Sequence, residues 1–136
     1  MSKSYYEMVK LPTYKERLEY LMLYGQLGRE TFGKHRQLNQ ALYRSHEWHT
    51  IRNKVILRNN GNDLGVDGYI IFEKPIIHHI NPITIEMVLN KDPMVFDMDN
   101  LILVSRRTHD IIHYAITTEG IENEPVVRRP NDTKLW

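Results

Sequence analysis

The chain of 136 residues contains no cysteine. This absence excludes disulfide bonds, zinc sites built on thiolates and cysteine nucleophiles together. The chain also has no apolar run near the ~20 residues that cross a bilayer. Its N-terminal sequence, MSKSYYEMVK, lacks the apolar stretch of a signal peptide. We therefore expect a cytoplasmic protein without a membrane partner.

The length and composition are those of one globular domain. Hydrophobic residues make up 41% of the chain and charged residues 26%, which excludes a wholly disordered protein. A single core typically needs ~100–150 residues. We expect one domain over residues 1–136.

The formal net charge of +1 conceals an asymmetry along the chain. Residues 1–60 hold 11 Lys and Arg against 5 Asp and Glu, whereas residues 61–136 hold 7 against 12. A basic half of this kind either binds a polyanion such as nucleic acid or forms solvated helix faces. Both interpretations are open at this point.

Residues 1–60 are expected to be helical. Thr13 and Glu16 have the spacing of a capping box, and apolar residues then recur at helical spacing until Gly25, a suitable stop. A shorter helix is expected over residues 35–43. Ser45 is a suitable N-cap for a third helix that ends at the Asn-Asn-Gly of residues 59–61.

This third helix is expected to have an apolar and a basic face. Its inward stripe is predicted to consist of Trp48, Ile51 and Val55. Three arginines, on this helix or just before it, are left for the outside, where they are either solvated or contact phosphates: Arg44, Arg52 and Arg58.

The second half is predicted to contain short strands and one helix. Residues 69–72 and 74–80 are apolar and rich in strand formers, as are residues 101–104. One helical turn is expected within residues 84–89. Ser105 is a suitable N-cap for a helix over residues 106–116. With an extended tail over residues 118–136, these elements predict an α+β fold in which helices pack against a strand–loop–strand–helix unit.

Four of the seven histidines fall in that unit. His109 and His113 are four residues apart, so both imidazoles lie on one helix face, close enough to hold one ion. His78 and His79 are adjacent on a strand and therefore point to opposite faces. One of them can complete a three-histidine site while the other projects elsewhere, which suits one metal ligand and one base. Three imidazoles favour Zn²⁺, Ni²⁺ or Mn²⁺ over Mg²⁺.

Two segments carry a resemblance to a known family. HHINPIT (residues 78–84) and FDMDNLILVSRRTHDIIHY (residues 96–114) resemble the HNH nuclease motif, a ββα-metal hairpin and helix, and above all that of the DNase colicins. Residues 43–61 resemble the helix that precedes this motif in many HNH proteins. The size of the chain and RRPNDT (residues 128–133) are similar to small HNH proteins of tailed phages. The resemblance covers residues 43–136, with the ββα core over residues 68–117.

The resemblance implies a role for each matching position. His78, His109 and His113 match the metal ligands, and His79 matches the general base that activates water. Asn100 matches the middle residue, which holds the connecting loop and helps to orient the base. One divalent cation is implied, and Mg²⁺, Mn²⁺, Ni²⁺ and Zn²⁺ all remain open.

The chain departs from the family pattern in two ways. It lacks the Cys-x-x-Cys pairs that hold a structural zinc in many HNH proteins, and NDLGVDG (residues 62–68) stands where one pair is expected. It also has histidine at all three ligand positions, so that His113 is either a ligand, a hydrogen-bond partner of a ligand or a phosphate contact.

The charged residues near the motif have more than one interpretation. Arg106 and Arg107 either contact DNA phosphates or are surface charges, and Asp97 and Asp99 more readily cap the loop than bind a cation.

Two functions follow as expectations. The first is a metal-dependent HNH DNA endonuclease that leaves 5′-phosphate and 3′-hydroxyl ends and, if phage-encoded, works in the host cytoplasm. The second is a non-catalytic DNA-binding or phage packaging accessory module, in which the metal is structural. For either function the resemblance implies DNA and a terminase or other packaging protein as partners.

Overall fold

A computed structural model describes residues 3–23, 36–121 and 123. The fold is α+β, because helices enclose one two-stranded antiparallel sheet. Its principal elements are α1 (Tyr5–Met8), α2 (Tyr14–Leu21), α3 (Arg36–Arg44), α4 (His46–Arg58), β1 (Ile76–His79), α5 (Ile85–Leu89), β2 (Leu101–Val104) and α6 (Arg106–Tyr114). Short 3-10 turns are η2 (Asp63–Gly65), η3 (Pro93–Val95) and η4 (Met98–Asn100). None of the helices in the described ranges is long and apolar enough to span a membrane.

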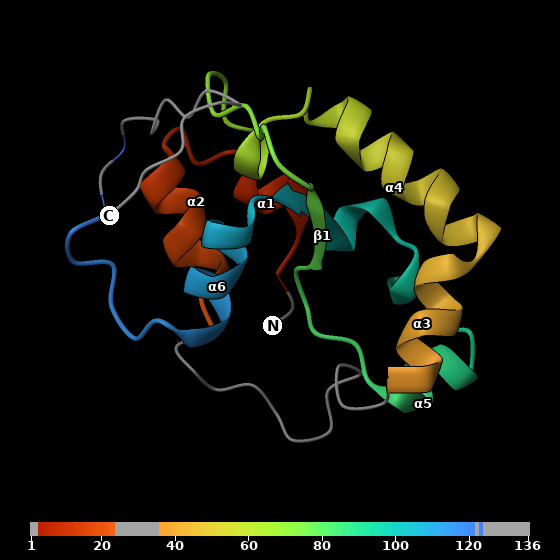
Figure 1. Ribbon diagram of the computed structural model, residues 1–136. Helices are drawn as coiled ribbons and strands as arrows, with labels where there is room; N and C mark the ends of the chain where they lie inside the picture. Colours follow the sequence, from red (N-terminus) through yellow and green to blue (C-terminus); the bar gives the residue numbers. More distant parts are fainter. Residues whose placement is uncertain (1–2, 24–35, 122, 124–136) are drawn as a thin grey trace, which may run out of the picture.

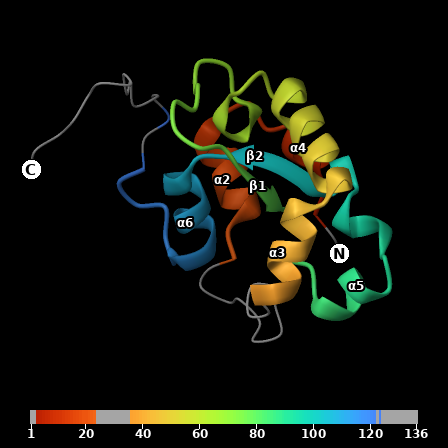
Figure 2. The same cartoon turned by 45° about the vertical axis from the view of Figure 1, so that its right-hand side comes forward.

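The sheet lies between two groups of helices, with α6 and α2 on one side and α4 on the other (Figures 1 and 2). All four residues of β2 are buried because both faces of this strand are covered. Ile102 and Val104 pack in the cluster formed with α2 and α6. Leu101 and Leu103 pack with Trp48 and Val55 of α4. The compact apolar run of β2 is thus explained by alternate side chains facing two cores.

Capping side chains begin the helices where the sequence predicts. The side chains of Thr13, Ser45, Thr84 and Ser105 each accept a hydrogen bond from a backbone N–H in the first turn of α2, α4, α5 and α6. The predicted caps Thr13, Ser45 and Ser105 are therefore confirmed, whereas Thr84 was not predicted as a cap. A serine or threonine hydroxyl satisfies a donor that has no partner within the helix, which is a local effect readable from sequence.

Two predicted boundaries are wrong, and one helix was not predicted. Helix α2 ends at Leu21 rather than near Gly25, which lies outside the described residues. Helix α6 ends at Tyr114, because Ala115 is already extended. Helix α1 is a single turn capped by Ser4. The predicted tail beyond residue 123, including RRPNDT, lies outside the described residues.

The predicted strand over residues 69–72 is wrong. In this segment only Ile70 forms a β-bridge, with Asn62. The Asp63 N–H donates to the Tyr69 carbonyl and the Ile71 N–H donates to the Gly61 carbonyl. The backbone groups of this apolar segment are therefore satisfied by the turn after α4 and not by a strand ladder.

The arginine expected on the outer face of α4, Arg58, instead lies partly buried. Its guanidinium donates to the carbonyls of Met98 and Leu101 and stacks 3.5 Å from the centre of the Tyr5 ring. Arg58 therefore ties α4 to the turn before β2. Trp48 and Val55 are buried as predicted, and Ile51 packs against them.

A buried carboxylate, Asp63, holds the start of α6. It accepts hydrogen bonds from the Ser105 N–H, the Ser105 hydroxyl and the Thr108 hydroxyl, and the Tyr14 hydroxyl lies 2.7 Å from that of Thr108. Burial raises the pKa of Asp63, and these hydrogen bonds oppose that rise. Asp63 lies in the NDLGVDG loop, so hydrogen bonds anchor this loop to α6.

We predict that Asp63→Ala lowers the free energy of unfolding by about 2–4 kcal/mol, because it leaves buried donors of Ser105 and Thr108 without an acceptor. Urea denaturation measures this change. Asp67→Ala, at an exposed position of the same loop, is the control and should stay within about 0.5 kcal/mol of wild type. Equal stability of the two variants would contradict the anchoring role of Asp63.

Candidate metal centre

The register of the sheet separates the two adjacent histidines. His78 pairs with Ile102 and His79 pairs with Leu101. Side chains that pair across antiparallel strands lie on the same face. His78 therefore lies on the α6 face with Ile102, and His79 lies on the α4 face with Leu101. The sequence prediction of opposite faces is confirmed.

Three histidines gather on the α6 face. His78 comes from β1, and His109 and His113 come from adjacent turns of α6. Each offers one ring nitrogen, and the three nitrogens all lie within 4.8 Å of one another. The ring centroids of His109 and His113 are 4.2 Å apart, and those of His78 and His113 are 5.1 Å apart. This cluster, His78, His109 and His113, is called the three-histidine site below.

Each imidazole of the three-histidine site has a buried nitrogen without a hydrogen-bond partner. These atoms are His78 Nε2, His109 Nδ1 and His113 Nε2. The nearest carboxylate oxygen to His109 Nδ1, from Asp110, lies 3.7 Å away, beyond hydrogen-bond distance. A buried nitrogen left unpaired costs about 1–3 kcal/mol. Three clustered histidines, each with a buried nitrogen that has no partner, fit a site that could hold a cation.

The pKa values of these histidines favour the neutral form that a metal requires. Burial lowers the pKa of His78 well below its usual range, and His113 and His109 add to the effect. Burial, followed by the neighbouring His109, lowers the pKa of His113 to about 4. Burial also lowers the pKa of His109, while Asp110 opposes the change. The three-histidine site therefore could hold one divalent metal ion.

On the other face of the sheet, His79 is held by two contacts. Its Nε2 lies 3.0 Å from the Val95 carbonyl oxygen, and its ring stacks on Trp48 at a centroid distance of 5.5 Å. A carbonyl only accepts hydrogen bonds, so Nε2 carries the proton and Nδ1 keeps its lone pair. Burial lowers the pKa of His79, with the Val95 hydrogen bond acting in the opposite direction. His79 is thus a neutral imidazole of defined tautomer, and its Nδ1 can accept a proton.

Asn100 ties the loop between the strands to the start of β2. Its side-chain oxygen accepts from the backbone and side-chain N–H groups of Asn81, both at 2.8 Å. Its amide donates to the carbonyls of Asn81 and Met94. Met94 directly precedes Val95, whose carbonyl holds His79. Asn100 is 2% exposed, and it fixes the backbone that orients the His79 ring.

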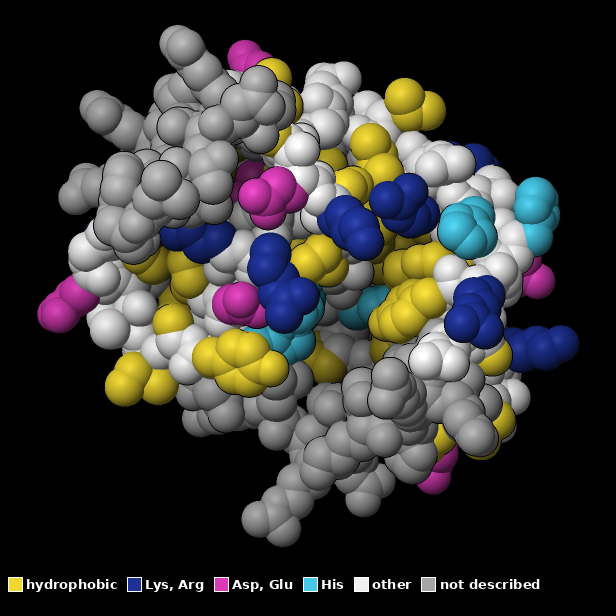
Figure 3. All heavy atoms as spheres, in the orientation of Figure 1, with side chains coloured by type: hydrophobic (Ala, Val, Ile, Leu, Met, Phe, Trp, Pro, Cys, Tyr) yellow, Lys and Arg dark blue, Asp and Glu magenta, His cyan; other side chains and the backbone are white. Residues whose placement is uncertain are grey.

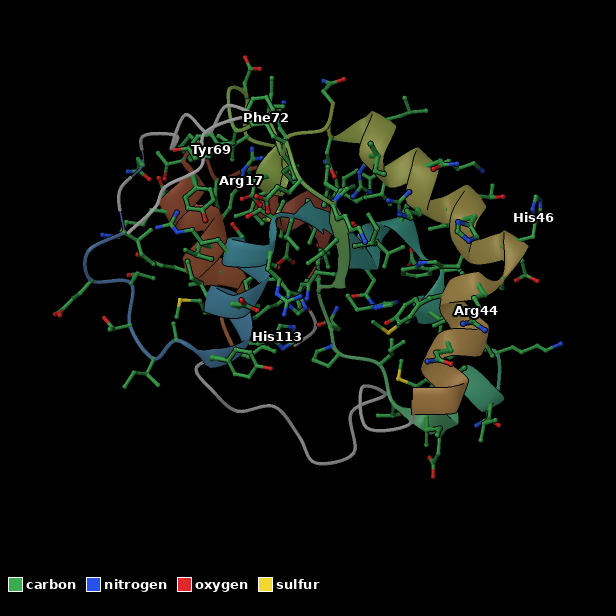
Figure 4. The ribbon with its side chains drawn as sticks, in the orientation of Figure 1. Arg17, Arg44, His46, Tyr69, Phe72 and His113 are labelled. Atoms are coloured by element: carbon green, nitrogen blue, oxygen red, sulfur yellow. The ribbon has the colours of Figure 1, made fainter. Side chains whose placement is uncertain are left out.

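The predicted arginines lie in two parts of the fold, at the start of α6 and on α3 and α4. Arg106 and Arg107 are exposed at the start of α6, and Arg106 forms an ion pair with Asp110 at 3.5 Å. Arg44 is exposed at the corner of α3 and α4, away from His113 (Figure 4). Arg52 is partly exposed on α4. Figure 3 shows histidine side chains in a hollow of this face, with Lys and Arg side chains around it. Nucleic-acid contact by these arginines stays a prediction.

Other polar groups have structural contacts. Asp97 accepts from the Asp99 N–H and Asp99 accepts from the Tyr6 N–H, so these aspartates cap the loop and hold α1. His46 and His49 are exposed on α4. Sequence reasoning did not single out Asn81 or Lys3, which bond to each other across 78 positions. No spacing pattern reveals a pair so distant in sequence.

Comparisons of the chain with family models, curated proteins and solved structures found no match.

We predict that Zn²⁺ or Ni²⁺ raises the melting temperature, because a metal that binds only the folded state stabilises it. At 100 times the dissociation constant the gain is about 2.7 kcal/mol. His109→Ala removes one ligand and should weaken metal binding more than roughly tenfold. Removal of a residue that only hydrogen-bonds to a metal ligand already lowers metal affinity about tenfold. Differential scanning fluorimetry and titration calorimetry measure these effects.

The control for metal binding is His49→Ala, which removes an exposed histidine of α4 and should bind like wild type. Equal affinity of His109→Ala and His49→Ala would show that the metal binds elsewhere.

We predict that the metal-free protein loses stability as the pH falls from 7.5 to 5.5. The lowered pKa values of His78, His79, His109 and His113 mean that the unfolded chain, with histidine pKa values of about 6.5, binds more protons than the folded one. The urea midpoint should therefore fall in this range, and fall less in His113→Gln. A midpoint that is constant or rises on acidification would contradict this assignment.

Proposed function

We propose that this chain is a metal-dependent DNA endonuclease of the HNH type, with β1, β2 and α6 as its ββα-metal unit. The observation that carries the proposal is the separation of adjacent histidines: His78 joins His109 and His113 in a cluster that could hold a metal ion, while His79 is held separately by the Val95 carbonyl. The two Cα atoms are about 3.8 Å apart across a trans peptide. His79 follows His78 directly in the chain but enters the other face of the strand, and we infer that one phosphodiester contacts both the metal site and this base during hydrolysis.

In the proposed reaction, His79 Nδ1 takes a proton from a water molecule as the water oxygen bonds to phosphorus. The bond from phosphorus to the 3′-oxygen breaks and the 3′-oxygen takes a proton from solvent water, which leaves 5′-phosphate and 3′-hydroxyl ends. His78, His109 and His113 would hold a divalent cation, which would supply positive charge to stabilise the added negative charge of the transition state. The Val95 carbonyl keeps the proton of His79 on Nε2, so the same nitrogen always faces the water.

Asn100 is a positioning residue in this mechanism. It touches neither water nor phosphate in the proposal, but it holds Asn81 and Met94 in the loop that carries Val95. The Trp48 ring supports the other side of His79. A base fixed on both sides loses little freedom when the reaction begins, which favours catalysis.

The alternative function is a non-catalytic DNA-binding or packaging module. The three-histidine site joins β1 to α6, so a metal there would also stabilise the fold. The burial and stacking of His79 would then serve packing. This alternative predicts that chelation lowers the melting temperature while no metal supports cleavage. A terminase or other packaging partner belongs to either proposal and rests on resemblance alone.

We predict that the purified protein nicks supercoiled plasmid with a divalent cation and that EDTA stops the reaction. His79→Ala should reduce the nicking rate by about 10²–10⁴, the usual contribution of a general base, and spare metal affinity. His79→Gln, which can still donate to the Val95 carbonyl, controls for loss of packing and should also be inactive. Nicking by either variant at the wild-type rate would disprove the role of His79.

A further inference from the structure

The backbone of Lys3 is fixed at the loop beside the three-histidine site. Its N–H donates to the Asn81 side-chain oxygen at 3.0 Å, and its carbonyl accepts from the Asn81 amide at 2.7 Å. Asn81 is three residues after His78 and is itself bonded to Asn100. The segment before α1 is therefore joined to the end of β1 by two direct hydrogen bonds.

The side chain of Lys3 extends toward the end of α2. Its ammonium lies 3.5 Å from the Met22 carbonyl. The next residue, Leu23, donates its N–H to the carbonyl of Ile112 at 3.0 Å, and Ile112 adjoins His113. Lys3 thus links the loop after His78 to the segment after α2, and that segment is bonded to the turn of α6 that carries His113.

The ammonium of Lys3 has no anionic partner in the part of the chain that the structure describes. It has three donors, and its contacts there are the long hydrogen bond to Met22 and the Tyr20 ring, 5.8 Å away. Burial lowers the pKa of Lys3.

A fixed positive charge beside a cation site is unfavourable unless an anion lies between the two charges. A phosphate group meets this requirement, because its oxygens can bond to the metal and accept from the ammonium at once. The loop of Asn81 and Asn100 holds the backbone of Lys3 in place. By contrast, the charge of Arg106 on α6 is already paired with Asp110.

We propose that Lys3 is a substrate-binding residue whose ammonium contacts the phosphate held at the three-histidine site. This assignment rests on the proposed function and adds the residue that recognises the phosphate. Lys3→Met keeps the aliphatic stem and removes the charge, and Lys3→Arg keeps the charge. Lys10→Met is the matched control, since it removes a lysine charge from an exposed position of the same N-terminal segment.

The test uses the metal-loaded full chain, with inorganic phosphate as probe in titration calorimetry and supercoiled plasmid in nicking assays. We expect Lys3→Met to weaken phosphate binding at least tenfold and to slow nicking about 10- to 100-fold, while metal affinity is unchanged or higher because a repelling charge is gone. The phosphate affinity and nicking rate of Lys3→Arg should stay within a fewfold of the wild-type values. Those of Lys10→Met should equal the wild-type values. A merely structural role would lower metal affinity as well.

The two proposals fail in distinguishable ways. If the wild type nicks plasmid, and Lys3→Met nicks plasmid and binds phosphate as well as the wild type does, the assignment of Lys3 is overturned. The nuclease proposal then stays intact. Loss of metal affinity in Lys3→Met together with phosphate binding would also overturn it. Lys3-dependent phosphate binding without nicking under any metal would support the assignment and overturn the nuclease proposal.

Discussion

The site depends on one constraint, the pairing of β1 with β2. Because His78 lies opposite Ile102 and His79 lies opposite Leu101, two adjacent imidazoles enter different environments. One meets the histidines of α6, and the other meets Trp48 of α4. A shift of this register by one residue would exchange the two faces and would direct His79 toward α6. The burial of all four β2 side chains resists such a shift, since each face of the strand fills a different apolar cluster.

Buried hydrogen bonds hold this arrangement where the chain has no cysteine with which to build a structural zinc site. Asp63 secures the start of α6, the helix that carries two of the three clustered histidines. Asn100 secures the loop that carries Val95, and Asn81 extends that loop to the backbone of Lys3. Each of these polar groups is buried or partly buried and satisfied, so removal of one partner leaves the others unpaired. The resulting order around the histidines favours a site with defined tautomers.

Features that depend on neighbouring residues could be predicted from the sequence. Capping by Ser45 and Ser105 is local, and so is the shared helix face of His109 and His113. Features that depend on distant partners could not. The segment of residues 69–72 has the composition of a strand, yet its hydrogen bonds go to the turn after α4. Arg58 was expected outside, but the carbonyls that it meets belong to residues 40 and 43 positions away.

The sequence by itself determined the α+β class, the helix starts and the presence of four histidines at spacings that favour a metal site and a base. Periodicity and capping are properties of short segments, and they act before the chain is folded. Only the tertiary structure decided which nitrogens remain without partners, that the Val95 carbonyl sets the tautomer of His79, and that the backbone of Lys3 bonds to Asn81 in the loop after His78. These outcomes depend on the meeting of residues from β1, α6 and the segment before α1, and spacing along the chain does not encode such meetings.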